Sequence, residues 1–198
     1  MMTTTAAPTA LAQLEDWLFE ALERSEGKVE IVNHRLVIEI TPGRNSAYAA
    51  LEIAVSMRAH VRARRLPGFA SANGYDYKVH GGAHQSFRPD ASYDVGPSSG
   101  MDLPKRAPRF AAEVRSVSDY GPAAEDMMRR KREDYFDAGT LAVWDVASGN
   151  DDAVVRLFRD GDAETPASVV RHGELAHAEP AVPGWTMPVD DLFEPVNE

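Results

Sequence analysis

The sequence predicts an α/β protein, because helical segments alternate with short strand-like segments along its 198 residues. Apolar residues at helical spacing mark helices over 11–23, 45–66 and 122–138. The runs between and after them are rich in β-branched and aromatic residues and are bounded by Gly, Pro, Asn and Asp. A chain of this length can bury a substantial core, so we expect a single domain over residues 1–198.

The chain is expected to open with a loose tail, residues 1–8, followed by a helix and a β-hairpin. Thr9 suits the N-cap of this helix, because its hydroxyl can accept a hydrogen bond from an early amide. Residues 28–40 are expected to form two short strands around a turn at 33–34. A Thr-Pro-Gly sequence at 41–43 then interrupts the pattern before the long second helix.

The middle of the chain is expected to contain strands over 69–79 and 90–95, followed by a Gly-, Pro- and Ser-rich loop over 96–108. His84 and Gln85 follow a glycine pair, and polar groups at such a place could suggest a metal site. Their spacing is not that of a zinc site, so we expect a surface loop here.

The last part of the chain is expected to add strands and then to lose regular structure. The strands are expected over 141–146, 153–158, 168–171 and 174–177. The first pair is joined by a predicted turn at 149–151. Residues 180–198 are rich in proline and are expected to form an irregular C-terminal segment.

The apolar run Phe110–Val114 has strand character but carries a carboxylate inside it. Side chains alternate across a strand, so Glu113 and Arg115 take the face opposite to Val114. Burying an unpaired carboxylate is costly, and Glu113 therefore requires a partner, an ion or a cleft.

The helix over 122–138 also carries a charged residue, Lys131, on a face that is predicted to be apolar. Its predicted apolar stripe passes through Met127 and Tyr135, and Lys131 lies on the stripe between them, while Arg132 is expected to point outward. A lysine on an inward stripe often extends to water, which is the simpler interpretation of Lys131 taken alone. Tyr135 could hold the lysine or contact a phosphate, or it could simply be a core aromatic residue.

Asp90, Glu113 and Lys131 together predict a more specific chemistry than each does alone. Two carboxylates can hold a hard cation through oxygen. Such a cation polarises a phosphate and lowers the pKa of a bound water, and a lysine can stabilise the charge of the transition state. The set is therefore the arrangement expected for metal-dependent cleavage of a phosphodiester.

At these positions the sequence resembles the PD-(D/E)XK nuclease superfamily and, within it, the Uma-two group of restriction-endonuclease-like proteins. The motifs that carry the resemblance are Pro89-Asp90, Glu113-Val114-Arg115 and Lys131. In that group the usual lysine two places after the Glu is absent, and a helix lysine substitutes for it. Here Arg115 stands at the strand position and Lys131 matches the helix lysine. The His that the group often carries near the start of the second helix is missing.

The resemblance implies a restriction-endonuclease-like mixed, curved sheet flanked by helices. It also implies a Mg²⁺ or Mn²⁺ site with Asp90, Glu113 and the Val114 carbonyl as ligands, and Lys131 as a catalytic residue. Glu30, on the first strand of the hairpin, would bind a second ion or position the water, although it could equally be an ordinary exposed strand acid. The implied substrate is a nucleic acid, DNA rather than RNA.

Composition limits these expectations. The net charge of −10 argues against indiscriminate binding of nucleic acid, which requires positive potential. This charge favours the alternative, a catalytically inactive nuclease-like scaffold acting as a binding or assembly module, in the form of a homodimer. The chain has no cysteine, which suits a cytoplasmic protein and excludes a thiolate nucleophile. It also has no signal peptide pattern and no apolar run long enough to cross a membrane, so no membrane partner is expected.

Overall fold

A mixed six-stranded sheet forms the centre of the computed structural model, which describes residues 9–38, 43–72, 75–117, 119–147 and 154–194. The strand order is β10-β9-β8-β7-β6-β3, and only β7 and β8 run parallel to each other. The strands are β3 (Phe69–Ala72), β6 (Ala91–Asp94), β7 (Phe110–Val114), β8 (Ala142–Ala147), β9 (Val154–Arg159) and β10 (Ser168–Val170). The expected mixed α/β architecture is confirmed.

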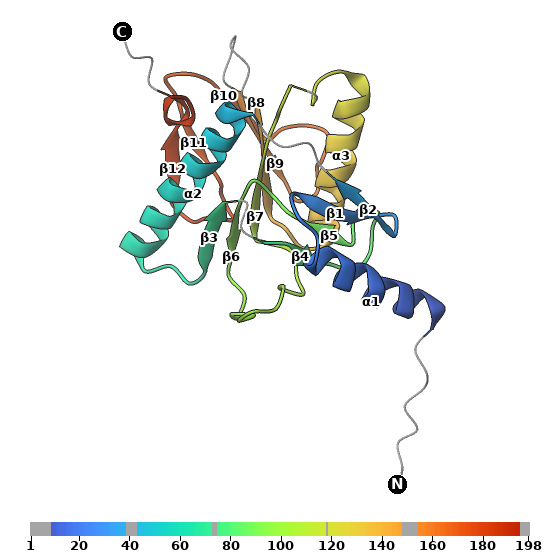
Figure 1. The fold of residues 1–198 in the computed structure, drawn as a ribbon. Coiled ribbons are helices and arrows are strands. Elements are labelled where there is room, and N and C mark those ends of the chain that lie inside the picture. Colours follow the sequence, from blue (N-terminus) through green and yellow to red (C-terminus); the bar gives the residue numbers. More distant parts are fainter. Residues whose placement is uncertain (1–8, 39–42, 73–74, 118, 148–153, 195–198) are drawn as a thin grey trace.

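Two helices cover opposite faces of this sheet (Figure 1). Helix α2 (Arg44–Arg64) packs on one face, and α3 (Pro122–Asp137) connects the parallel strands β7 and β8 on the other. Parallel strands require a crossover connection, and α3 supplies it. Gly121, with φ +96°, precedes α3, and Pro122 begins it where a missing N–H leaves no hydrogen bond unmade.

The N-terminal hairpin lies on the α3 side of the molecule (Figure 1). Strands β1 (Val29–Val32) and β2 (Arg35–Ile38) are joined by the predicted two-residue turn, whose residues Asn33 and His34 have φ values of 50° and 57°. Helix α1 (Ala10–Glu23), capped by Thr9 as expected, packs its buried leucines against β1. This hairpin is held to the short pair β4 (Tyr77–Lys78) and β5 (Ser86–Phe87), because the Ile31 N–H donates to Ser86 Oγ over 2.7 Å.

The C-terminal segment closes the α2 side of the core. After β11 (Leu175–His177), the residues expected to be irregular include a short strand, β12 (Thr186–Pro188), and a 3-10 turn, η1 (Val189–Leu192). The Trp185 ring stacks on Trp144 with ring centroids 4.8 Å apart, so this segment completes the core instead of trailing from it. The predicted tail 1–8, the break at residues 41–42 and the turn at 149–151 lie outside the described residues.

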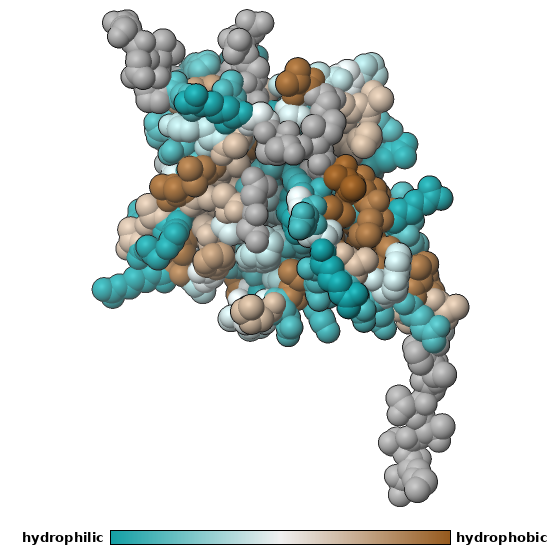
Figure 2. Space-filling model, viewed as in Figure 1, coloured by the Kyte–Doolittle hydropathy of each residue, from teal (hydrophilic) through white to brown (hydrophobic). Residues whose placement is uncertain are grey.

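The β1–β2 hairpin exposes several apolar side chains. On the face drawn in Figure 2, hydrophobic residues gather over the β1–β2 hairpin, where Leu36, Val37 and Ile38 are exposed. No helix in the described part of the chain combines the length and the apolarity needed to cross a membrane.

The predicted apolar stripe of α3 is wrong at two positions. Met127 is 70% exposed, and Arg132, expected on the outer face, is buried. The buried side of α3 combines aromatic and charged residues, and its charged part faces β8, where Arg132 Nη1 lies 3.2 Å from Asp145 Oδ2. The expectation of a surface loop at His84 and Gln85 is also wrong, since both side chains are buried.

Candidate active site

The register of β6 and β7 places Asp90 beside Glu113. Ala91 pairs with Ala112 in this antiparallel ladder, so one further step in the same register brings Asp90 opposite Glu113. Asp90 Oδ2 accepts a hydrogen bond from the Val114 N–H over 2.8 Å, which fixes this carboxylate just before the start of β6. Both acids are buried. The carboxylates predicted from the sequence are therefore neighbours in space.

The alternation along β7 matches the prediction and directs Glu113 towards α3. Phe110, Ala112 and Val114 belong to the core under α2, whereas Ala111 packs with Tyr135 on the opposite face. On a strand, the N–H and C=O of one residue point to the same side. The Val114 carbonyl thus lies on the Asp90 side of β7, where the resemblance expects a ligand oxygen.

Lys131 reaches into this group of acids from the middle of α3. Its Nζ lies 3.0 Å from Glu30 Oε1 and 3.1 Å from Glu113 Oε1. The Tyr135 hydroxyl, one helical turn later, donates to the same Glu113 oxygen over 2.7 Å. Tyr135 also stacks on Phe87, with ring centroids 4.0 Å apart, so it serves the core and orients Glu113 at once. The simpler interpretation, in which Lys131 extends to water, is therefore wrong: the side chain is buried and ends among the acids.

Glu30 is part of the same group and is not an exposed strand acid. One of its oxygens accepts a hydrogen bond from the Arg88 N–H over 2.8 Å and faces Lys131. The other lies 3.8 Å from His84 Nε2. Glu30 comes from β1, which the contact with β5 holds in place, so segments far apart in the sequence converge here.

Lys28 is a site residue that the sequence analysis missed. Its Nζ lies 3.0 Å from Asp90 Oδ1 and 3.7 Å from Glu113 Oε2. The available signal was its position two residues before Glu30, since alternation along an extended segment puts both side chains on one face. The acids Glu30, Asp90 and Glu113 are thus interleaved with the ammonium groups of Lys28 and Lys131.

His84 and Asp134 form a second buried pair beside Glu30. Asp134 Oδ2 lies 2.6 Å from His84 Nδ1 and accepts a hydrogen bond from the His84 N–H over 3.1 Å. Gly82 allows this approach: its φ is +71°, and a Cβ there would lie 2.3 Å from Asp134 Oδ1. Asp134, three residues after Lys131 on α3, therefore anchors the loop that carries His84.

Arg115 belongs to a structural network and does not point into the group of acids. Its guanidinium donates to Asp145 Oδ1 over 2.5 Å and to Oδ2 over 2.6 Å, and it also donates to Glu125 at the start of α3. The bonds to Asp145 raise the pKa of Arg115. Burial lowers the pKa of Arg132, which approaches the same carboxylate. This network ties α3 to β7 and β8 and so aims Lys131 at Glu113.

The donor set fits a hard cation held by few protein oxygens. Within the described residues, no three His, Asp or Glu side chains are gathered as a ready metal site. The ammonium groups of Lys28 and Lys131 stand between these carboxylates. Mg²⁺ usually keeps several waters and binds one or two carboxylates, so Asp90 and Glu113 suffice in number and chemistry.

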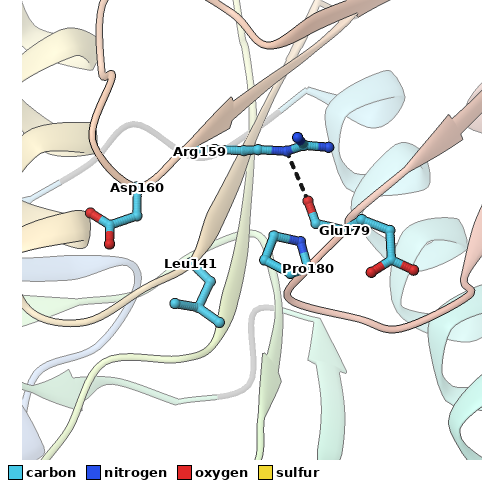
Figure 3. A pocket seen from close by; sticks show the side chains of 5 residues that line it. All are labelled: Leu141, Arg159, Asp160, Glu179 and Pro180. Carbon is cyan, nitrogen blue, oxygen red and sulfur yellow. Dashed lines mark hydrogen bonds between the residues drawn. The ribbon is translucent and has the colours of Figure 1, made fainter.

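A separate hollow of about 410 Å³ lies where β8 begins and β9 ends (Figure 3). It is lined by Leu141, Arg159, Asp160, Glu179 and Pro180. Arg159 donates to the Glu179 carbonyl over 3.0 Å, while the carboxylates of Asp160 and Glu179 point away from this bond. Its charged groups do not converge, in contrast to those around Glu113.

The chain is similar to known proteins in both fold and sequence. The fold matches the crystal structure of a protein described as a putative nuclease belonging to DUF820, from Anabaena variabilis, with a TM-score of 0.67. The two chains are 16% identical, and the match covers 91% of this chain and 96% of the other, so the likeness establishes a shared fold. Residues 11–190 match the Uma2 family, described as "Putative restriction endonuclease". The chain belongs to the Uma2 family. No curated protein matches it.

Proposed function

We propose that the chain is a Mg²⁺- or Mn²⁺-dependent nuclease that hydrolyses phosphodiester bonds, with DNA as its substrate. The observation that supports this most is the convergence of Lys131 on Glu30 and Glu113, beside Asp90. Burying so many charges is costly, and a neutral packing role would be served better by apolar side chains. Membership of the Uma2 family points in the same direction.

Each residue has a defined task in this proposal. Asp90 and Glu113 hold the cation, with the Val114 carbonyl as a further oxygen. The bound cation would polarise the phosphate and supply an activated water. Tyr135 keeps Glu113 oriented through its 2.7 Å hydrogen bond. Glu30 positions the attacking water or holds a second ion.

Lys131 is the residue that stabilises the charge of the transition state. Its ammonium lies 3.1 Å from Glu113 Oε1, so it would be close to a phosphate held by a cation on Asp90 and Glu113, without leaving the helix face. Preorganised charges of this kind act strongly in a buried site because they need no reorganisation during the reaction.

The test is a nicking assay with Mg²⁺ or Mn²⁺ on single-stranded, duplex and branched DNA, with RNA as a comparison. Asp90→Asn should abolish cleavage, and Lys131→Ala should lower the rate by about a hundredfold or more. Arg130→Ala is the matched control, because Arg130 neighbours Lys131 on α3 but is exposed and pairs with Asp126. Activity that survives Asp90→Asn would refute the assignment.

The rival function is a catalytically inactive scaffold, and the net charge of −10 favours it. Under this alternative the wild-type protein is inert on every substrate with either ion, and Asp90→Asn changes nothing. Size-exclusion chromatography with light scattering then decides whether the scaffold is a homodimer.

A further inference from the structure

We propose that Lys28 is a displaceable counter-ion of the metal site. In the metal-free protein its ammonium bridges Asp90 and Glu113, and a divalent cation must expel it in order to bind between them. This inference rests on the proposed function, since it takes these two acids to be the metal ligands.

The oxygens that Lys28 faces are the ones directed at the shared space between the two acids. Its Nζ lies 3.0 Å from Asp90 Oδ1 and 3.7 Å from Glu113 Oε2. The second oxygen of each acid makes a different contact: Asp90 Oδ2 accepts from the Val114 N–H, and Glu113 Oε1 accepts from Tyr135 and faces Lys131. One ammonium thus stands where a bridging cation would stand.

The ammonium and a divalent cation are incompatible at this position. Mg²⁺ holds its oxygen ligands at about 2.0–2.1 Å. The Lys28 nitrogen is farther from both oxygens than that, so the carboxylates must close in and leave no room for it. Two cations between the same oxygens would also repel each other strongly in a buried setting.

The two lysines of the site differ in how they are held. Lys131 projects from the middle of α3, a rigid element. Lys28 lies just ahead of β1 and follows Gly27, whose φ of +85° marks a bend, and a Cβ on Gly27 would meet no atom within 4 Å. The Lys28 side chain is 13% exposed and that of Lys131 is 10% exposed, so the difference between them lies in the elements that carry them. Lys28 is therefore the one able to withdraw, while Lys131 remains on Glu113.

The test compares Mn²⁺ binding by the wild-type protein and by Lys28→Met, using calorimetry and thermal unfolding. Removing the positive charge of Lys28 should tighten Mn²⁺ binding by about tenfold or more. The repulsion between two cations a few ångströms apart is large enough to account for a change of this size. Metal-free Lys28→Met should melt at a lower temperature than the wild type, and Mn²⁺ should raise its melting temperature by more. Lys78→Met is the control: Lys78 is similarly buried, at 15% exposed, but pairs with Glu23 away from the site.

The outcomes separate this inference from the proposed function. If Lys28→Met binds Mn²⁺ no more tightly than the wild type while Asp90→Asn loses binding, the counter-ion role is wrong and the metal site stands. If neither the wild type nor Lys28→Met binds Mn²⁺, both proposals fail. Should Lys28→Met not fold, Lys28→Gln keeps a polar donor, one atom shorter, without the charge, and it must also bind Mn²⁺ more tightly.

Discussion

Replacing Arg115 with methionine tests whether the residue at the motif's strand position is structural. Arg115 is buried and holds both oxygens of Asp145, which is 1% exposed. Removing one partner of a buried ion pair costs about 3–5 kcal/mol, because the other charge is left without compensation. Arg132 still reaches Asp145 over 3.2 Å, so we expect the lower end, about 3 kcal/mol.

The measurement is the free energy of unfolding in urea, without metal. Glu125→Gln is the control, because Glu125 contacts the other side of the same guanidinium but its side chain is 49% exposed. An exposed ion pair contributes about 0–1 kcal/mol. The double variant Arg115→Met with Asp145→Asn should lose less stability than the two single losses combined, because both single changes break the same ion pair. If Arg115→Met costs no more than Glu125→Gln, the network does not hold α3, and the account of how Lys131 is aimed is wrong.

Two further predictions concern the hydrogen bonds of the site and the acid side of the stability profile. Tyr135→Phe keeps the stacking on Phe87 but removes the bond to Glu113, so it should cost about 1.5–3 kcal/mol in urea unfolding, whereas Tyr120→Phe, at an exposed position, should cost almost nothing. Hydrogen bonds from Arg115 lower the pKa of Glu125 below its ordinary value of 4.5. A carboxylate whose pKa is lower in the folded state stabilises the protein above its unfolded-state pKa, and this stability is lost as the pH falls through its folded-state pKa. Glu125→Gln should therefore flatten the loss of stability below about pH 4.5. An unchanged slope would contradict the pairing of Glu125 with Arg115.

The sequence by itself determined the features that depend on local periodicity. Alternation along Phe110–Val114 decides that Glu113 faces away from Val114, and helical spacing decides that Lys131 and Tyr135 share the inner side of α3. The two-residue turn at Asn33 is likewise a local matter, since backbone chemistry there selects the hairpin. The fold class and the direction of the key side chains follow from such patterns.

Only the tertiary structure decided which charges meet. Lys28 contacts Asp90 from 62 residues away, and His84 meets Asp134 across 50 residues, so neither pair leaves a periodic signal. Met127 is exposed and Arg132 is buried, against the expected stripe, and Arg132 is buried because the surface that α3 covers there carries Asp145. An apolar stripe assumes an apolar partner surface. At this site the partner surface is charged, and the register of the strands determines which charge each helix residue finds.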